Sequence, residues 1–287
     1  MSAFESSAWE STEPPPDDWS VQAARWLAKP DSYFVWGPLL TLIVTIVFLC
    51  NCWRDVRRLF FNNMPKTKSH HTAAVIWLHG TGDAGAGFAF LKKACERELR
   101  HIKWVLPDAP RTPLTAAQGA PRRAWVDVAA MPIKLERKPD DAARLAVASD
   151  RVDRLVAAEV AKGIPASRIV LGGFSQGAAV AVWAAARPGA AQIAGVVAWS
   201  GYALCADELP RCLERSPNRS AAHLVCHGTH DTKVLPECGG QLATILRQSG
   251  VPVTQRTEYA MDHECCEEQL DDLKAFLRRQ VPPAEQS

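Results

Sequence analysis

From residue 72 onwards, short apolar or β-branched runs alternate with longer segments that have helical character. The short runs predict strands at residues 73–78, 102–106, 169–171, 193–199, 223–226 and 253–258. The segments between them predict helices at residues 88–100, 140–161, 176–186, 236–248 and 264–279. Residues 107–121 are rich in proline and are expected to be irregular. Strands that alternate with helices predict an α/β fold with a mainly parallel central sheet and helices on both faces.

The pattern before residue 72 is different. Residues 1–32 are acidic and proline-rich and predict a disordered tail. Residues 33–53 contain no charged side chain and have Trp36 and Trp53 near their ends, so they predict one N-terminal transmembrane helix. The juxtamembrane linker at 54–71 is basic. By the positive-inside rule, the segments that follow it are therefore expected in the cytosol, namely the domain at 72–281 and the short tail at 282–287. These features predict a single-pass membrane protein with a cytosolic catalytic domain.

Composition adds few constraints. The net charge is +2 and gives no reason to expect nucleic-acid binding. The nine cysteines are an odd number without zinc-type spacing, which is typical of reduced thiols. Cys50 and Cys52 lie at the cytosolic end of the predicted span, where either S-palmitoylation or an ordinary apolar role is possible.

The most informative motif is G-x-S-x-G, formed by Gly173, Ser175 and Gly177. It lies between a predicted buried strand and an alanine-rich helix, which is the context of a nucleophile elbow. In such a turn the serine hydroxyl is raised above the sheet edge, and glycines allow the strand and helix backbones to approach closely. Ser175 is therefore the candidate nucleophile.

A serine nucleophile needs a base, and the base needs an orienting acid. In α/β-hydrolases these residues follow in the order serine, acid, histidine, each in a loop after a strand. Asp231 follows the strand predicted at 223–226, and His263 follows the strand predicted at 253–258. We therefore expect a catalytic triad of Ser175, Asp231 and His263.

Other polar residues near these loops are weaker candidates. His79 and His227 each precede a glycine at a strand end, where a structural role is more common, and His230 lies in the loop of the acid. Asp262 adjoins His263 and is expected to point elsewhere. A metal site would have to use the set His227, His230, His263, Cys265 and Cys266, which has no recognised ligand spacing, so we expect no metal.

The oxyanion hole is expected to consist of two backbone N–H groups. One belongs to Gln176, directly after the nucleophile. The other is assigned to Thr81, in the glycine-containing loop that follows the first predicted strand. That loop lacks the Lys-Ser/Thr pair of a phosphate-binding loop.

Several separate motifs in this order resemble the acyl-protein thioesterase, or phospholipase/carboxylesterase, family of α/β-hydrolases. The resemblance covers residues 73–277 and rests on W-L-H-G-T-G-D at 77–83, P-D-A-P at 107–110, P-L-T at 113–115, W-V-D at 125–127, the run 163–177, His227-Gly228 with Asp231, and Met261 with His263. It implies the same triad and oxyanion hole, and it implies that Trp125 lies near the active site as a substrate-binding residue. It also implies that no cofactor is used.

The resemblance implies hydrolysis of S-acylated proteins, lysophospholipids or small carboxylic esters. Thr81, Thr232 and Cys265-Cys266 depart from the residues usual in the family, and Thr232 replaces a proline. We therefore expect a membrane-anchored serine hydrolase, most simply a palmitoyl-protein thioesterase. A lysophospholipase or general carboxylesterase with the same triad, and a catalytically weak acyl-binding protein, remain open. The loops around residues 129–135 and 202–213 are expected to form the acyl groove.

Overall fold

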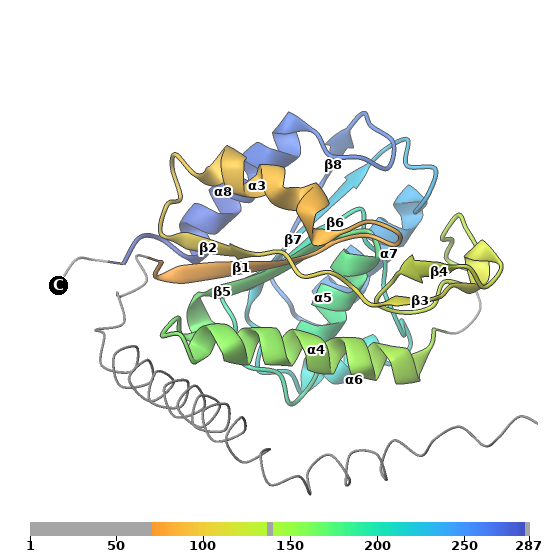
Figure 1. The fold of residues 1–287 in the computed structure, drawn as a ribbon, viewed down its shortest axis with the longest axis horizontal. Coiled ribbons are helices and arrows are strands. Elements are labelled where there is room, and N and C mark those ends of the chain that lie inside the picture. The colour runs from red at the N-terminus through yellow and green to blue at the C-terminus, as the bar shows by residue number, and fades with distance from the viewer. Residues whose placement is uncertain (1–70, 137–139, 285–287) are drawn as a thin grey trace, which may run out of the picture. The chain divides into compact units, whose positions relative to one another are not determined.

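The computed structural model describes residues 71–136 and 140–284. The described residues belong to one compact unit, built around a six-stranded sheet with the order β2-β1-β5-β6-β7-β8 (Figure 1). Every neighbouring pair of strands in this sheet is parallel. The predicted tail, transmembrane span and linker, with Cys50 and Cys52, lie outside the described residues.

The strands and helices follow the predicted alternation. The strands of the sheet are β1 (Ala73–Leu78), β2 (Ile102–Val105), β5 (Ile169–Phe174), β6 (Gly195–Trp199), β7 (Ala222–Gly228) and β8 (Val253–Tyr259). The α-helices are α3 (Ala89–Cys95), α4 (Ala142–Val160), α5 (Gln176–Ala186), α6 (Leu209–Glu214), α7 (Pro236–Gln248) and α8 (Glu267–Gln280). Short 3-10 turns lie at Gly85–Phe88, Thr115–Ala117 and Ala166–Arg168.

Helices cover both faces of the sheet, as predicted. Side chains of α3 and α8 pack with one face of the strands in a cluster that includes Trp77 and Trp199. Side chains of α4, α5, α6 and α7 pack in a larger cluster on the other face, and Figure 1 shows the two layers of helices on opposite sides of the strands. The prediction of an α/β fold with a parallel sheet is confirmed.

Two local predictions differ from the structure. The region expected to be irregular contains an antiparallel pair, β3 (Arg111–Pro113) and β4 (Pro121–Arg123). The helix predicted at 88–100 ends at Cys95, and the chain then turns through backbone hydrogen bonds from Glu98 and Leu99 to the Cys95 carbonyl. Apolar spacing continues through this turn, so the pattern alone does not mark the end of the helix.

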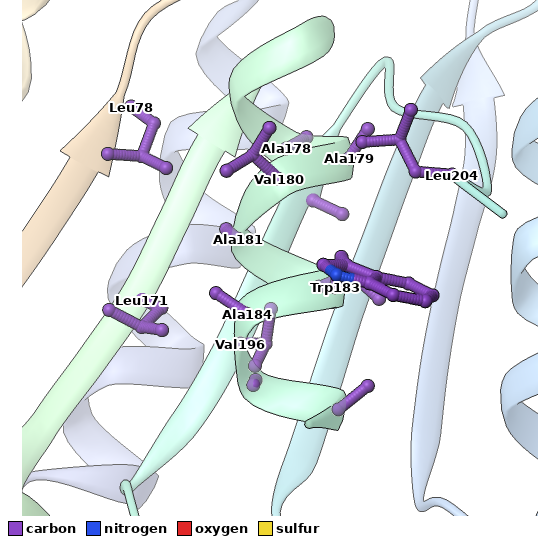
Figure 2. Close-up of a cluster of buried hydrophobic side chains, with 14 of the residues drawn as sticks. Leu78, Leu171, Ala178, Ala179, Val180, Ala181, Trp183, Ala184, Val196 and Leu204 are labelled. Carbon is purple, nitrogen blue, oxygen red and sulfur yellow. The ribbon is translucent and has the colours of Figure 1, made fainter. Parts of the chain in front are cut away.

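The central helix α5 explains the alanine-rich run after the elbow. All of its residues are buried, and its small side chains pack against Leu78, Leu171 and Val196 of the sheet and against Leu204 (Figure 2). Small side chains let the helix lie close to the strands. The close approach is greatest at Gly177, where an added Cβ would lie 2.1 Å from the backbone oxygen of Leu78.

We therefore expect Gly177→Ala to destabilise the protein by about 3 kcal/mol or more, because the added methyl group forces the helix away from β1. Urea unfolding of the full chain measures this change. Gly240→Ala is the matched control, since Gly240 is also helical but an added Cβ meets nothing within 4 Å. That variant should be unchanged or more stable by up to about 1 kcal/mol, and equal losses in both variants would contradict the packing explanation.

Strand β7 contains a histidine that must stay neutral. His223 is buried, and burial lowers its pKa to about 4 although its Nδ1–H donates to the Ala221 carbonyl. The unfolded chain therefore binds a proton at higher pH than the native state does, and stability falls as the pH drops from about 6.5 to about 4. We expect this residue to account for about 2 kcal/mol of lost stability at pH 5. Urea unfolding at pH 7 and pH 5 should show a smaller difference in His223→Leu, and an equal difference would contradict this origin.

The predicted membrane localisation is corrected. Among residues 71–136 and 140–284, no helix is both long enough and apolar enough to cross a bilayer. Helix α5 is apolar on all sides but has 11 residues, whereas a span needs about 20. Helix α4 has 19 residues but includes Arg144, Asp150 and Arg154. The prediction of a single-pass membrane protein with a cytosolic catalytic domain is therefore not supported by the described residues.

Candidate active site

Ser175 lies in the sharp turn between β5 and α5, as predicted for a nucleophile elbow. Its φ of 55° and ψ of −121° are unusual for a residue with a side chain. The turn is so tight that an added Cβ at Gly173 would lie only 2.4 Å from the backbone carbon of Gly177. The Ser175 N–H donates to the Trp199 carbonyl at 2.8 Å. Both glycines are thus required by the close approach of strand and helix.

The structure brings Asp231 and His263 into direct contact. Asp231 follows β7 and His263 follows β8, and the His263 Nδ1–H donates to Asp231 Oδ2 at 2.7 Å. The other carboxylate oxygen of Asp231 accepts the backbone N–H groups of Lys233 at 2.9 Å and Val234 at 2.8 Å. These hydrogen bonds fix the carboxylate, which in turn fixes the orientation of the imidazole ring.

His227 completes the environment of this carboxylate. It is buried, its Nε2–H donates to the Val234 carbonyl at 2.8 Å, and Nε2 lies 3.3 Å from Asp231 Oδ2. Asp231 is 2% exposed, and this burial raises its pKa. Hydrogen bonds from His227, His263 and the Val234 N–H outweigh that effect and hold the pKa well below its usual range. Asp231 is therefore an anion beside His263 at neutral pH.

Asp262 does not contact the imidazole ring of His263. Its Oδ1 accepts the Thr232 N–H at 2.7 Å, the Thr232 hydroxyl at 2.9 Å and the His263 N–H at 2.8 Å. Thr232 stands at a position where the resemblance expects proline, which has no N–H to donate. This substitution therefore allows the loops that carry Asp231 and His263 to be joined through Asp262.

Ser175, Gln176 and His263 line one cavity of about 320 Å³ with Gly80 and Thr81. Most of the remaining lining is apolar and comes from Val128, Met131, Ile133, Phe174 and Tyr202, with Asp83 and Lys233 as the charged members. A second cavity of about 500 Å³ shares Val128, Met131, Ile133 and Tyr202 with the first. The loops expected to form a groove thus contribute Met131, Ile133 and Tyr202.

The two N–H groups expected to form an oxyanion hole belong to different elements, the start of α5 and the loop after β1. Gln176 is the first residue of α5, where backbone N–H groups have no partner within the helix. Thr81 lies in the loop after β1, next to Gly80, where an added Cβ would be 3.3 Å from Ser175 Cβ. Trp125, expected to bind substrate, is 3% exposed and is not part of the cavity lining. Its indole Nε1–H instead donates to the His79 carbonyl at 2.8 Å.

Two contributions to the site were not visible in the sequence. The sequence favours a structural role for His227, and its contact with Asp231 depends on the fold of the loop between them. The sequence indicates no role for the Gln176 side chain, whereas in the structure it is 1% exposed and hydrogen-bonded to the segment at Trp125. A glutamine at the first position of an otherwise apolar helix is the signal in the sequence that could have drawn attention to it.

The cysteines near the site are poor nucleophiles. The seven cysteines in the described part of the chain are not in disulfides. Burial raises the pKa of Cys226 and of Cys265 to about 12, so neither is a thiolate at neutral pH. In the described part of the chain, no group of three or more histidine, cysteine or acidic side chains is placed to hold a metal ion.

Comparison with known proteins shows the family of the chain. The sequence model of the Phospholipase/Carboxylesterase family matches residues 62–281. The chain belongs to this family. Acyl-protein thioesterase 1 of Neurospora crassa is 32% identical over 219 residues, which cover 75% of this chain and 89% of the relative. Acyl-protein thioesterase 1 of Emericella nidulans is 32% identical over 227 residues, which cover 76% of this chain and 94% of the relative.

Solved structures show the same fold. Zea mays acyl-protein thioesterase 2 is 28% identical, with a TM-score of 0.64, over 76% of this chain and 96% of that one. Arabidopsis thaliana SOBER1 is 25% identical, with a TM-score of 0.66, over 73% of this chain and 99% of that one. The predicted family is confirmed, and the protein is a hydrolase of the esterase and thioesterase class with an α/β-hydrolase fold. These matches give no support to the predicted membrane localisation.

Proposed function

We propose that this hydrolase cleaves the thioester of S-acylated cysteines in proteins, through an acyl-enzyme formed on Ser175. The observation that carries the proposal is the 2.7 Å contact from His263 Nδ1 to Asp231 Oδ2, in a site whose cavity also contains Ser175. With Nδ1 donating to the carboxylate, Nε2 of His263 is left as the base.

The chemistry proceeds in two steps. Ser175 Oγ attacks the acyl carbonyl carbon while His263 Nε2 takes the hydroxyl proton, and the N–H groups of Thr81 and Gln176 stabilise the negative charge on the carbonyl oxygen. The C–S bond then breaks, and the cysteine sulfur leaves with the proton from His263. In the second step, water loses a proton to His263 and attacks the ester on Ser175, which releases the fatty acid and restores the serine. Asp231 remains an anion throughout and stabilises the protonated imidazole.

The substrate assignment rests on two supports. Relatives at about one-third identity carry the name acyl-protein thioesterase. The cavity at Ser175 is lined mainly by apolar side chains and adjoins a second cavity through Met131 and Tyr202, which suits an acyl chain that extends away from the reacting carbonyl.

A second candidate is lysophospholipase or carboxylesterase activity with the same residues. It is favoured by the family to which the chain belongs, Phospholipase/Carboxylesterase. An oxygen ester presents the same carbonyl to Ser175, so the two activities differ in the leaving group and in what surrounds it.

The test offers the full chain an S-palmitoylated cysteine peptide, the matching O-palmitoyl serine peptide and a lysophospholipid, and compares kcat/KM. The proposal predicts the highest value for the thioester peptide. A higher value for the lysophospholipid would assign the protein to the second candidate. Saturable binding of the acyl peptide without turnover would instead support an acyl-binding protein.

A further inference from the structure

A chain of buried hydrogen bonds joins the two elements that carry the oxyanion N–H groups. It begins at the side chain of Gln176, whose backbone N–H is one of these groups. The Gln176 Oε1 accepts the backbone N–H of Trp125 at 2.7 Å and that of Val126 at 3.4 Å. Its Nε2 donates to the Val126 carbonyl at 2.9 Å. The side chain thus pairs with the backbone of residues 125–126 on both its donor and its acceptor side.

The same segment holds the loop that contains Thr81. The Trp125 Nε1–H donates to the His79 carbonyl at 2.8 Å, two residues before Thr81. The Gly82 N–H, on the other side of Thr81, donates to the Arg123 carbonyl at 2.7 Å. The backbone at Thr81 is therefore anchored on both sides to residues 123–125.

The hydrogen bonds of His79 attach this loop to the segment at Ala109 and fix one tautomer of the imidazole ring. The Ala109 N–H donates to His79 Nε2 at 2.9 Å, so the ring proton is on Nδ1, which donates to the Gly80 carbonyl at 2.7 Å. His79, Trp125 and Gln176 are all buried. Water therefore cannot readily replace a hydrogen bond that is lost among them.

We propose that Gln176 and Trp125 are positioning residues that set the separation of the Thr81 and Gln176 N–H groups in the oxyanion hole. One residue, Gln176, then supplies one N–H directly and fixes the other through the Trp125 indole and the His79 carbonyl. This inference rests on the proposed function, because it assumes that an oxyanion forms between these two groups. It gives Trp125 a role in catalysis without contact with the substrate.

Positioning has a distinct kinetic consequence. Loss of an oxyanion donor lowers kcat by about 10²- to 10³-fold, because the donor acts mainly on the transition state. A displaced donor should cost less than a missing one. We therefore expect Trp125→Phe, which keeps an aromatic ring but removes the Nε1–H donor, to lower kcat about 10- to 100-fold and to change KM by less than about threefold.

The matched control is Trp77→Phe. Trp77 is buried in β1, and its Nε1 has no hydrogen-bond partner among the described residues. The control therefore makes the same change in side-chain size in the core without removing a hydrogen bond. It should lose stability to a similar degree and keep kcat within about threefold of the unaltered protein.

The experiment measures kcat and KM of the full chain with the palmitoylated peptide or the best substrate found, and it measures thermal unfolding of each variant. It also measures the inhibition constant of a long-chain trifluoromethyl ketone, which forms a tetrahedral adduct. Trp125→Phe should weaken the ketone about as much as it lowers kcat, whereas the fatty acid product should bind as before. A kcat equal to that of Trp77→Phe, or a change confined to KM, would overturn the inference.

A second variant keeps the test decisive if Trp125→Phe does not fold. Gln176→Met retains the backbone N–H and a side chain of similar size, but it can neither accept the Trp125 N–H nor donate to the Val126 carbonyl. It should show the same selective loss of kcat and of ketone affinity, and unaltered values would overturn the inference. Ser175→Ala separates this outcome from failure of the proposed function: if that variant remains active, the assignment of Ser175 is wrong whatever Trp125→Phe shows.

Discussion

Replacement of Ser175 by alanine is expected to lower kcat by about a million-fold for every acyl substrate that the protein hydrolyses. The alanine lacks the oxygen that forms the acyl-enzyme, so neither His263 nor the oxyanion hole can compensate. The backbone should be unaffected, because alanine and serine both carry a Cβ and are equally strained at the φ of 55° found at this position. The measurement is the rate of acyl release by the full chain, with thermal unfolding to establish that the variant is folded.

Ser200→Ala is the matched control for this experiment. Ser200 is also a buried serine with positive φ, at 48°, and it follows the neighbouring strand β6. Its hydroxyl has no hydrogen-bond partner within the described part of the chain, and it does not line the cavity at Ser175. We expect its activity to stay within about threefold of the unaltered protein. Retention of more than one-hundredth of the activity by folded Ser175→Ala would contradict the role of Ser175.

The second large effect is expected at Asp231. Asp231→Asn should lower kcat by about 10⁴-fold, because an amide NH₂ facing His263 Nδ1 favours the tautomer with its proton on Nε2, which cannot act as the base. The variant also removes the anion that stabilises the protonated imidazole. The measurement is kcat at saturating substrate and pH 7.5.

Asp262→Asn provides the comparison with an adjacent carboxylate. Asp262 binds the backbone N–H groups of Thr232 and His263 through Oδ1, and asparagine retains an oxygen that can accept both. We expect a loss of less than about tenfold. If the two variants were impaired equally, the acid of the triad would not be Asp231 alone, and the loop joined by Thr232 and Asp262 would have to be included in the mechanism.

The elbow and the order of the candidate triad could be predicted because their signals are local. Gly173, Ser175 and Gly177 stand within five positions of one another, and each glycine meets a backbone that leaves no room for a side chain. Asp231 and His263 each follow a strand, and parallel strands bring their carboxyl ends to the same edge of the sheet. The sequence therefore predicted the contact between them, although they are 32 positions apart.

The support around these residues could not be predicted in the same way. The contact of Gln176 with Trp125 spans 51 positions, and that of Trp125 with His79 spans 46. Such contacts depend on how β4 and the following loop pass over the ends of β1 and β5, and no periodicity in the sequence encodes this path. The pairing of β3 with β4 could not be predicted either, because Pro113 and Pro121 face each other at one end of the pair and obscure its strand character.

The most direct test of the central claim is covalent labelling of the full chain with a long-chain alkyl fluorophosphonate, which reacts only with an activated serine. Intact mass should show one adduct per chain, and peptide mapping should locate it on Ser175. Labelling should be slowed in Asp231→Asn and absent in Ser175→Ala. An adduct on another residue, or a folded protein that is not labelled, would contradict the assignment of Ser175, Asp231 and His263 as a working triad.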